Sequence, residues 1–437
     1  MRCFLYGFAS LSAVAAVGCG PDLGSEELDA KSNEPAANWE RNLLDTRLEI
    51  DIEAHTATAI VSVDRHTRRG LSLDVRGLEL AEVLGASGGG ALQPLRHRVV
   101  DGNLELALPA GKSAEVHIRY AFAVQQKLEG LTTGGATFTW PHFCGNLFPC
   151  QPDPDDGLTF ELSLTNVPEG KRAVHAAKIP SDAPPYMLAW AVGDYTRLDL
   201  GTTAQGRKVS VDYLPGEKTA ATTGTKHLGA VFEWLETTYG EYLFGDEVGS
   251  VSASWGQGAF GGMEHHPFWH VSHDSMGDAE THAHEAAHGW FGDGVRLRCW
   301  EDLTLSEGTT SYVTARALEA VKGKAAGDAV WQDYESRLDD VIASEDRLAW
   351  PEGCNEIDVL GELWNEVPYM KGAFFYRAVE AAVGRDPLDA ALRAFYAVHR
   401  GEAASVSDML DSIRETTGFD AGSLAEGWLR SLGRPDK

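Results

Sequence analysis

The sequence predicts an α+β chain of more than one domain, with an antiparallel β-sheet domain first and a mainly helical domain after it. Its 437 residues exceed what one hydrophobic core usually organises. From about residue 40 to 200, apolar and polar residues alternate, which is typical of strands with one solvated face. Past about residue 220, apolar residues recur at helical spacing. We therefore predict a β domain over residues 39–203 and a helical domain over residues 204–437.

The N-terminus resembles an export signal. Arg2 precedes an apolar run that is too short to cross a bilayer and that ends in small residues before Cys19. This ending resembles a bacterial lipoprotein processing site, so we expect a signal peptide over residues 1–18 and a lipid on Cys19; an ordinary cleaved signal is the alternative. Residues 19–38 are polar and contain Pro and Gly, as in a flexible tether. We thus expect an exported protein, anchored to the membrane at the bacterial cell envelope (periplasm-facing or at the cell surface) or else secreted.

Within the β domain, strict alternation predicts strands around residues 48–52, 71–75 and 116–120, and glycine-rich pieces at 85–90 and 101–103 predict turns. In the second half, helical spacing is clearest over residues 225–243 and 278–292, and residues 369–428 predict several amphipathic helices.

Four cysteines remain outside the predicted signal and lipidation site, and an even number in an oxidising compartment predicts two disulfides. Of the three possible pairings we favour Cys144–Cys150 and Cys299–Cys354. No two cysteines have C-x-x-C spacing, which argues against a cysteine zinc site.

The chain is strongly acidic. Its 65 Asp and Glu residues against 37 Lys and Arg residues leave a formal net charge of −28. Such a chain is repelled by nucleic acid phosphates and by anionic lipid head groups. We therefore expect no nucleic acid partner and no polybasic membrane-binding surface.

One motif predicts specific chemistry. His284, Glu285 and His288 form an H-E-x-x-H sequence within a helical pattern. Four residues make about one helical turn, so both imidazoles project from one face and can bind one metal ion, while Glu285 can reach a water molecule on that ion. Glu307, in the next predicted helix, would complete a His₂Glu zinc site with an open position for water.

The neighbouring sequence resembles the membrane alanyl aminopeptidase family of zinc metallopeptidases, the gluzincin aminopeptidases. The resemblance is strongest over residues 284–313, which contain the motif and Glu307. Upstream, residues 261–265 (GGMEH) resemble the family's Gly-x-Met-Glu-Asn motif, and downstream, residues 367–376 (VPYMKGAFFY) resemble the segment with its catalytic tyrosine. In the first half, LFPCQPDPDDGLTFELSLTNVPEG and YMLAWAVGDY resemble stretches of the family's β domain.

The resemblance implies a saddle-like β domain followed by a thermolysin-like catalytic domain that holds one Zn²⁺. His284, His288 and Glu307 would be the zinc ligands. Glu285 would be the general base that takes a proton from zinc-activated water, and Tyr369 would donate a hydrogen bond to the oxyanion.

The resemblance also implies how a peptide substrate is held. Glu264 would bind the free α-amino group, which an internal peptide bond lacks. Gly261, Gly262 and Met263 would run beside the substrate as an edge strand, with the glycines permitting close approach.

The sequence departs from the family pattern in three places. His265 stands where the family usually has Asn, and an imidazole there could be cationic near pH 6 and alter recognition of the amino terminus. Trp140 lies where the family often has a Gln that reaches the substrate amine. The sequence ends at Lys437, near the usual end of the family's catalytic domain, so we expect a short form without the C-terminal helical domain and with a more open cleft.

Two questions about nearby residues stay open. Asp293 and Asp302 could orient a ligand imidazole or could be solvated surface carboxylates. The other nearby histidines are expected to be hydrogen-bonding or rim residues; they are His265, His266, His270, His273 and His282.

Three functions are compatible with these features. The first is a zinc aminopeptidase at the bacterial cell envelope. The second is an endopeptidase or specialised protease of exported proteins that uses the same zinc site. The third is a binding protein with a vestigial zinc site, although a pure binding protein needs neither Glu285 nor Tyr369.

Overall fold

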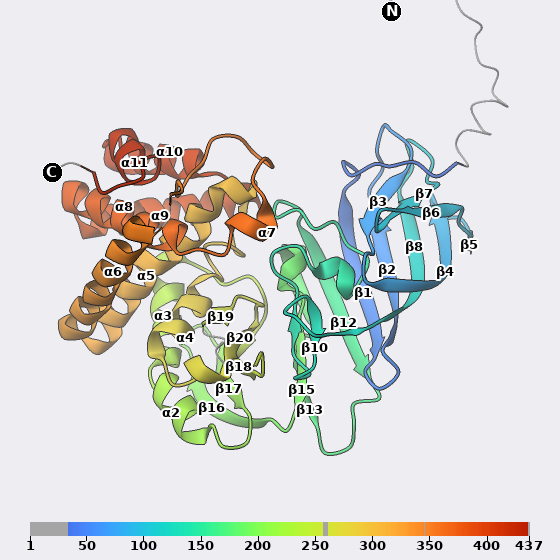
Figure 1. Cartoon of the computed structure of the whole chain (residues 1–437), viewed down its shortest axis with the longest axis horizontal. Coiled ribbons are helices and arrows are strands. Elements are labelled where there is room, and N and C mark those ends of the chain that lie inside the picture. The colour runs from blue at the N-terminus through green and yellow to red at the C-terminus, as the bar shows by residue number, and fades with distance from the viewer. Residues whose placement is uncertain (1–33, 257–260, 345, 436–437) are drawn as a thin grey trace, which may run out of the picture.

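The computed structural model of the protein describes residues 34–256, 261–344 and 346–435. The predicted signal peptide, Cys19 and residues 19–33 of the predicted tether lie outside the described residues. A group of β-sheets built from the first half of the chain lies beside a sheet and a set of helices built from the second half (Figure 1). The predicted α+β multidomain fold is therefore confirmed.

The main sheet of the first half has seven strands in the order β14-β12-β1-β2-β8-β4-β5. Their bounds are β1 Leu43–Asp51, β2 Thr56–Val63, β4 Leu78–Ser87, β5 Gln93–Pro94, β8 Ala114–Phe122, β12 Leu158–Thr165 and β14 Lys178–Ala183. Along β8, alternate side chains are buried, as the alternation of polar and apolar residues predicts. Tyr120, for example, is buried, whereas Arg119 is exposed.

Three smaller sheets complete this part. Their strands are β3 Leu71–Asp74, β6 His97–Val100, β7 Asn103–Leu106, β9 Val124–Gln125, β10 Gly130–Thr132, β11 Thr137–Phe138, β13 Arg172–His175 and β15 Trp190–Gly193. They pair as β3-β7-β6, β11-β10-β9 and β13-β15.

Two strand pairs of the predicted antiparallel β domain are parallel instead. β1 pairs with β12 in parallel, and β9 pairs with β10 in parallel. An alternating pattern is the same for both pairings, because side chains have period two in either direction. The more than 100 residues between β1 and β12 let the chain return in either direction.

The second part is built on a five-stranded sheet in the order β16-β17-β18-β20-β19. The strands are β16 Thr196–Thr202, β17 Lys208–Tyr213, β18 Glu247–Ala253, β19 Gly262–Met263 and β20 Phe268–Ser272. β17, β18 and β20 are parallel, and β19 is an antiparallel edge strand. The predicted boundary between residues 203 and 204 falls between β16 and β17, two paired strands, so the sheet begins before that boundary.

Helices pack on this sheet and beyond it. They are α2 Lys218–Gly224, α3 Leu228–Tyr239, α4 Ala279–Ala287, α5 Leu303–Lys322, α6 Lys324–Ser344, α7 Val359–Glu362, α8 Val367–Val383, α9 Arg385–His399, α10 Val406–Thr417 and α11 Gly422–Trp428. α5 contacts α4, α6 and α8, and every residue from Leu303 to Leu318 is buried. This central helix therefore rigidly supports the side chains that it places against α4. Among the described residues, no helix has the length and apolar character needed to cross a membrane.

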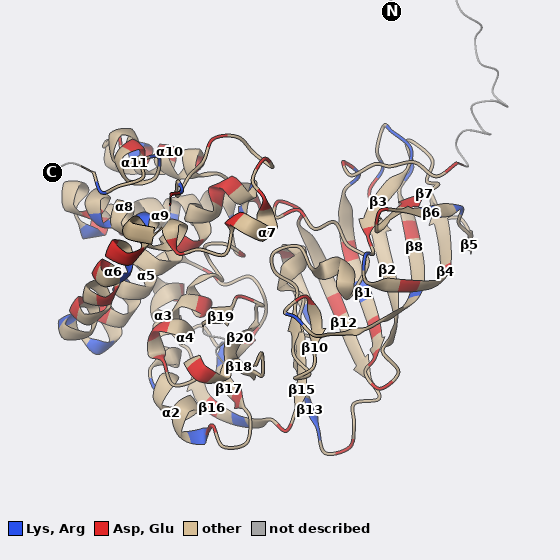
Figure 2. Ribbon diagram, in the orientation of Figure 1, with Lys and Arg blue, Asp and Glu red and all other residues tan. Residues whose placement is uncertain are grey.

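Both favoured disulfides, Cys144–Cys150 and Cys299–Cys354, are present. Acidic residues are spread along the sheets and the helices alike (Figure 2). The two parts of the molecule meet at Arg296, which is buried. Its guanidinium donates hydrogen bonds to the carbonyl oxygens of Asp155, Asp182 and Gly401.

Candidate active site

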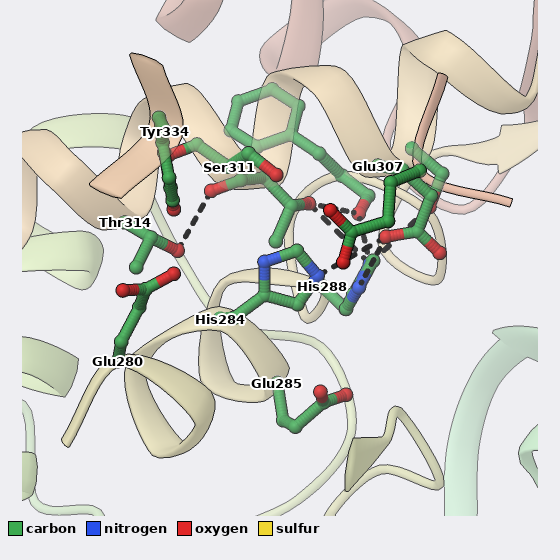
Figure 3. Close-up of polar contacts among 12 residues, drawn as sticks. Glu280, His284, Glu285, His288, Glu307, Ser311, Thr314 and Tyr334 are labelled. Carbon is green, nitrogen blue, oxygen red and sulfur yellow. Dashed lines mark hydrogen bonds and ion pairs between the residues drawn. The ribbon is translucent and has the colours of Figure 1, made fainter. Parts of the chain in front are cut away.

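Two helices bring the three predicted metal ligands together. His284 and His288 lie one turn apart at the end of α4, and Glu307 lies in the second turn of α5. Glu307 Oε2 is 3.1 Å from Nε2 of His284 and 3.4 Å from Nε2 of His288 (Figure 3). Each of the three residues offers a ligand atom, and these atoms all lie within 4.8 Å of one another.

The hydrogen bonds of His288 suit a metal ligand. Its Nδ1 is 3.0 Å from the carbonyl oxygen of Phe291, an atom that can only accept, so Nδ1 bears the hydrogen and Nε2 presents a lone pair towards Glu307. The imidazole nitrogen and the carboxylate of Glu307 therefore face each other with lone pairs. A cation between them relieves the repulsion. Two imidazole nitrogens and one carboxylate oxygen are a donor set that zinc accepts, with a fourth position left for water or substrate. The residues present therefore fit a zinc ion.

The pKa values of these side chains agree with this arrangement. Burial alone would raise the pKa of Glu307, but the adjacent His288 and His284 lower it to about 2. Burial alone would lower the pKa of His288, but Glu307, Glu264 and Glu285 raise it well above its ordinary value. The site thus favours a positive charge between these groups.

Glu285 projects from α4 apart from the cluster of His284, His288 and Glu307 (Figure 3). A carboxylate oxygen of Glu285 nevertheless lies within 4.8 Å of a ring nitrogen of His288. Burial raises its pKa well above the ordinary value. The main chain of β19 passes so close that a Cβ atom at Gly262 would lie 2.5 Å from Glu285 Cγ, so only glycine fits there.

The GGMEH segment forms the sheet edge that was predicted. Gly262 and Met263 pair with Val271 and His270 of β20, and within the described ranges no strand pairs with the other side of β19. Glu264 follows at the end of β19, only 3% exposed, and burial raises its pKa to about 7. Tyr369, in the first turn of α8, places its ring 5.9 Å from that of His284 at an interplanar angle of 17°.

These groups line one cleft of about 700 Å³, and all nine predicted catalytic, metal and substrate residues lie around it. Residues from distant segments complete the lining. They are Trp140, Ser275, Asp278, Glu280, Thr281, Asp333, Arg337, Leu363, Trp364, Asn365 and Glu366. Most of these gave no sequence signal because α6 and the 363–366 segment belong to no motif. The short spacing between Trp364 and Tyr369 could have identified the segment.

Within the described part of the chain, Asp293 and Asp302 neither orient a ligand imidazole nor lie on the solvated surface. Both are buried, so they are not solvated surface carboxylates. Asp302 accepts a hydrogen bond from the backbone N–H of Val406, and neither residue is hydrogen-bonded to a ligand imidazole among the described contacts. The carbonyl oxygen of Phe291, which side-chain chemistry does not reveal, orients His288 instead.

The other histidines are not extra ligands among the described residues, and four of the five make hydrogen bonds. Nδ1 of His266 contacts Tyr242 Oη, that of His270 the carbonyl oxygen of Thr137, that of His273 Glu217 Oε1 and that of His282 Ser250 Oγ. His265 is buried with neither ring nitrogen hydrogen-bonded. Burial holds its pKa well below the ordinary value, so the expectation that it is cationic near pH 6 is wrong.

Comparisons with known proteins agree with this geometry. Residues 269–428 match the Peptidase family M1 domain. The chain is 26% identical over 167 residues to the probable M1 family aminopeptidase 2 of Encephalitozoon cuniculi, a match that covers 37% of this chain and 19% of that protein. It is 23% identical over 345 residues to the probable aminopeptidase 1 of Sulfurisphaera tokodaii, covering 68% of this chain and 41% of that protein. The matches therefore span less than half the length of these relatives.

Solved structures share the fold over most of the chain. The M1 zinc metallopeptidase of Deinococcus radiodurans has a TM-score of 0.74 at 19% identity, covering 91% of this chain and 96% of that one. Aminopeptidase A of Legionella pneumophila, in complex with aspartic acid, has a TM-score of 0.75 at 18% identity, covering 91% of this chain and 50% of that one. Residues 269–428, with the H-E-x-x-H helix, are thus similar to the catalytic domain of M1 peptidases, and the chain has the fold of two-domain M1 zinc metallopeptidases.

Proposed function

We propose that this chain is a zinc-dependent aminopeptidase that releases N-terminal residues from peptides, with one Zn²⁺ per chain held by His284, His288 and Glu307. The observation that supports it best is the meeting of these ligands with Glu285, Glu264 and Tyr369 around one cleft beside an open sheet edge. The relatives named above are described as aminopeptidases, and a related crystal structure from Deinococcus radiodurans has a bound Tyr-Ser-Ala substrate.

The chemistry that zinc supplies when bound is Lewis acidity, which polarises a carbonyl group and makes water a stronger acid. Glu285, buried beside His288, is placed to take the proton of the attacking water and to pass it to the leaving amine. Burial raises the pKa of Glu285, which increases the affinity of its carboxylate for that proton.

Two groups hold the substrate carbonyl and main chain. The hydroxyl of Tyr369 stays protonated at neutral pH, because burial and the nearby carboxylates raise its pKa well above the ordinary value. It can therefore donate a hydrogen bond to the oxygen that becomes negative in the transition state. The free edge of β19 offers backbone groups to an extended peptide, as in strand addition.

Glu264 accounts for release from the amino terminus. Its carboxyl group is buried and has no Lys or Arg nearby among the described groups that affect its pKa. A substrate ammonium would supply the missing positive charge, whereas an acylated nitrogen would leave the carboxylate unpaired. Peptides with a free amino terminus are therefore the proposed substrates.

The proposed place of action is the bacterial cell envelope, with the chain attached through a lipid on Cys19. Support for this comes from Arg2, the short apolar run and the small residues before Cys19.

The test is a paired hydrolysis assay on zinc-loaded protein without the first 19 residues. It compares free-amine peptides with the same peptides N-acetylated. Glu285→Gln is the blank, and the exposed Glu415→Gln on α10 is the control. We expect cleavage of only the free peptides, one residue at a time, and a loss of at least 1000-fold in kcat/KM for Glu285→Gln with its zinc content unchanged.

Internal cleavage of acetylated peptides would replace the proposal with an endopeptidase that uses the same site. Absence of hydrolysis in the zinc-loaded protein would leave only the binding function. Near-normal rates for Glu285→Gln would reject the role of Glu285 as the base.

A further inference from the structure

One end of the cleft is walled by aromatic rings. Trp140 and Trp364 both line the cleft, with ring centroids 4.9 Å apart and planes at 85°. Phe138 lies behind them, nearly parallel to Trp364 at 6.1 Å. Trp140 is only 3% exposed, whereas Trp364 is 52% exposed although it is a large apolar side chain. An exposed tryptophan in a cleft is a strong indication of a binding contact.

The position of edge strand β19 indicates which part of a bound peptide would face the aromatic rings. At the start of the GGMEH segment, the N–H of Gly261 donates to Ser275 Oγ, in the turn that leads into α4. At its other end, the ring of His265 lies 6.1 Å from that of Phe138. Glu264, next to His265, is thus at the aromatic end of the cleft. A peptide whose amino group is bound by Glu264 places its first side chain there and its later residues towards Gly261.

The cleft also has a polar part. Asp278, Glu280, Asp333, Arg337 and Glu366 line it. Arg337 forms ion pairs with Glu366 at 2.9 Å and with Glu280 at 3.2 Å. Among the described residues that line the cleft, Arg337 is the only Lys or Arg, and it is already paired with Glu366 and Glu280, so the lining offers no unpaired Lys or Arg to an acidic side chain.

We propose that Trp140 and Trp364 form the subsite for the side chain of the first substrate residue and select large apolar or aromatic residues over small or acidic ones. The inference rests on the proposed aminopeptidase function. Indole faces give apolar area and ring contacts to a Phe or Leu side chain, whereas a small side chain leaves that area unfilled. A carboxylate there would lose its hydration without gaining a partner.

The segment with Trp364 is fastened in place. The Cys299–Cys354 disulfide joins it to the residues before α5. Glu301 accepts backbone hydrogen bonds from Asn355, Glu356 and Ile357. Next to Trp364, Leu363 is only 3% exposed, which anchors the segment on the other side. A side chain held in this way loses little conformational entropy when a ligand binds.

The experiment measures kcat/KM on zinc-loaded protein for free-amine tripeptides that differ only in the first residue: Phe, Leu, Ala or Glu. It compares wild type with Trp364→Ala, Trp364→Phe and Leu360→Ala. Leu360 is the matched control, because it is 56% exposed on the same segment and does not line the cleft. We expect wild type to prefer Phe over Ala by at least about tenfold, and Glu to be the poorest substrate.

Trp364→Ala should reduce the Phe-to-Ala ratio about tenfold, Trp364→Phe should recover most of it, and Leu360→Ala should behave as wild type. Equal rates for Phe and Ala in wild type, or equal losses for all substrates in Trp364→Ala, would overturn the inference. A second measurement, calorimetric binding of phenylalaninamide and alaninamide to Glu285→Gln, separates the subsite from the reaction. Preference for phenylalaninamide without any hydrolysis by wild type would retain the subsite and reject the proposed function, and equal affinities would reject the subsite.

Discussion

Gly262 shows how tightly single residues constrain the site. Any Cβ atom there would lie 2.5 Å from Glu285 Cγ, while the backbone itself is in a region open to other residues. We therefore expect Gly262→Ala to displace the Glu285 carboxylate and to lower kcat/KM at least tenfold, with zinc content unchanged. The control is Gly277→Ala, where the new Cβ atom would lie 3.6 Å from its nearest neighbour. Equal activity in both variants would show that Glu285 tolerates the displacement.

The effect of a substitution at Glu264 should depend on the charge of the substrate's amino terminus. Glu264→Gln keeps the shape of the side chain but removes the charge that pairs with an ammonium group. Loss of one partner of a buried charge pair costs roughly 2–5 kcal/mol, so we expect kcat/KM for free-amine peptides to fall about 100-fold. Any residual cleavage of N-acetylated peptides should change little. Similar losses for both substrates in parallel kinetic assays would mean that Glu264 does not read the amine.

At the scale of elements, the two disulfides differ in the length of chain that they close. Cys299–Cys354 joins residues 55 apart, whereas Cys144–Cys150 joins residues six apart. Loop-closure entropy therefore predicts about 4 kcal/mol of stabilisation from the first and about 2 kcal/mol from the second. We expect the double variant Cys299→Ser/Cys354→Ser to have the lower Tm of the two double serine variants in calorimetry. A larger loss for the short loop would contradict the entropic account.

The elements also show which local patterns suffice for prediction. α4 could be predicted because its histidines recur at one helical turn and Asp278 caps its first N–H groups. α3 ends at Tyr239, earlier than the helical spacing over residues 225–243 suggests, because Gly240 has φ of +122°. The parallel pairing of β1 with β12 could not be predicted, because it depends on where a distant segment returns.

At the scale of the whole molecule, the junction at Arg296 makes stability depend on pH. Asp156 lies beside it, and burial raises the pKa of its carboxyl group from 3.8 to about 7, although Arg296 opposes the shift. Between these two pH values the folded chain holds a proton that the unfolded chain has lost. The stabilisation is therefore complete below pH 3.8 and is lost as the pH rises through about 7.

We accordingly expect Asp156→Asn to lose less stability than wild type between pH 5 and pH 8. Thermal unfolding at a series of pH values measures this, and Asp246→Asn, at a side chain that is 88% exposed, is the control. Parallel Tm curves for wild type and Asp156→Asn would mean that Asp156 does not hold the proton in the folded state.

The sequence by itself predicted the two-part α+β fold and the H-E-x-x-H pair, because helical and strand periods and the H-E-x-x-H spacing are local properties of the chain, whereas Glu264 and Tyr369 were indicated by the family resemblance. Only the tertiary structure decided that the carbonyl oxygen of Phe291 orients His288, that His265 is buried and neutral, and that Trp364 and Arg337 share a cleft with the metal ligands. The physical reason is that burial and cleft lining depend on which distant segments meet. α4, α6 and the segment before α8 come together only when the core around α5 is packed.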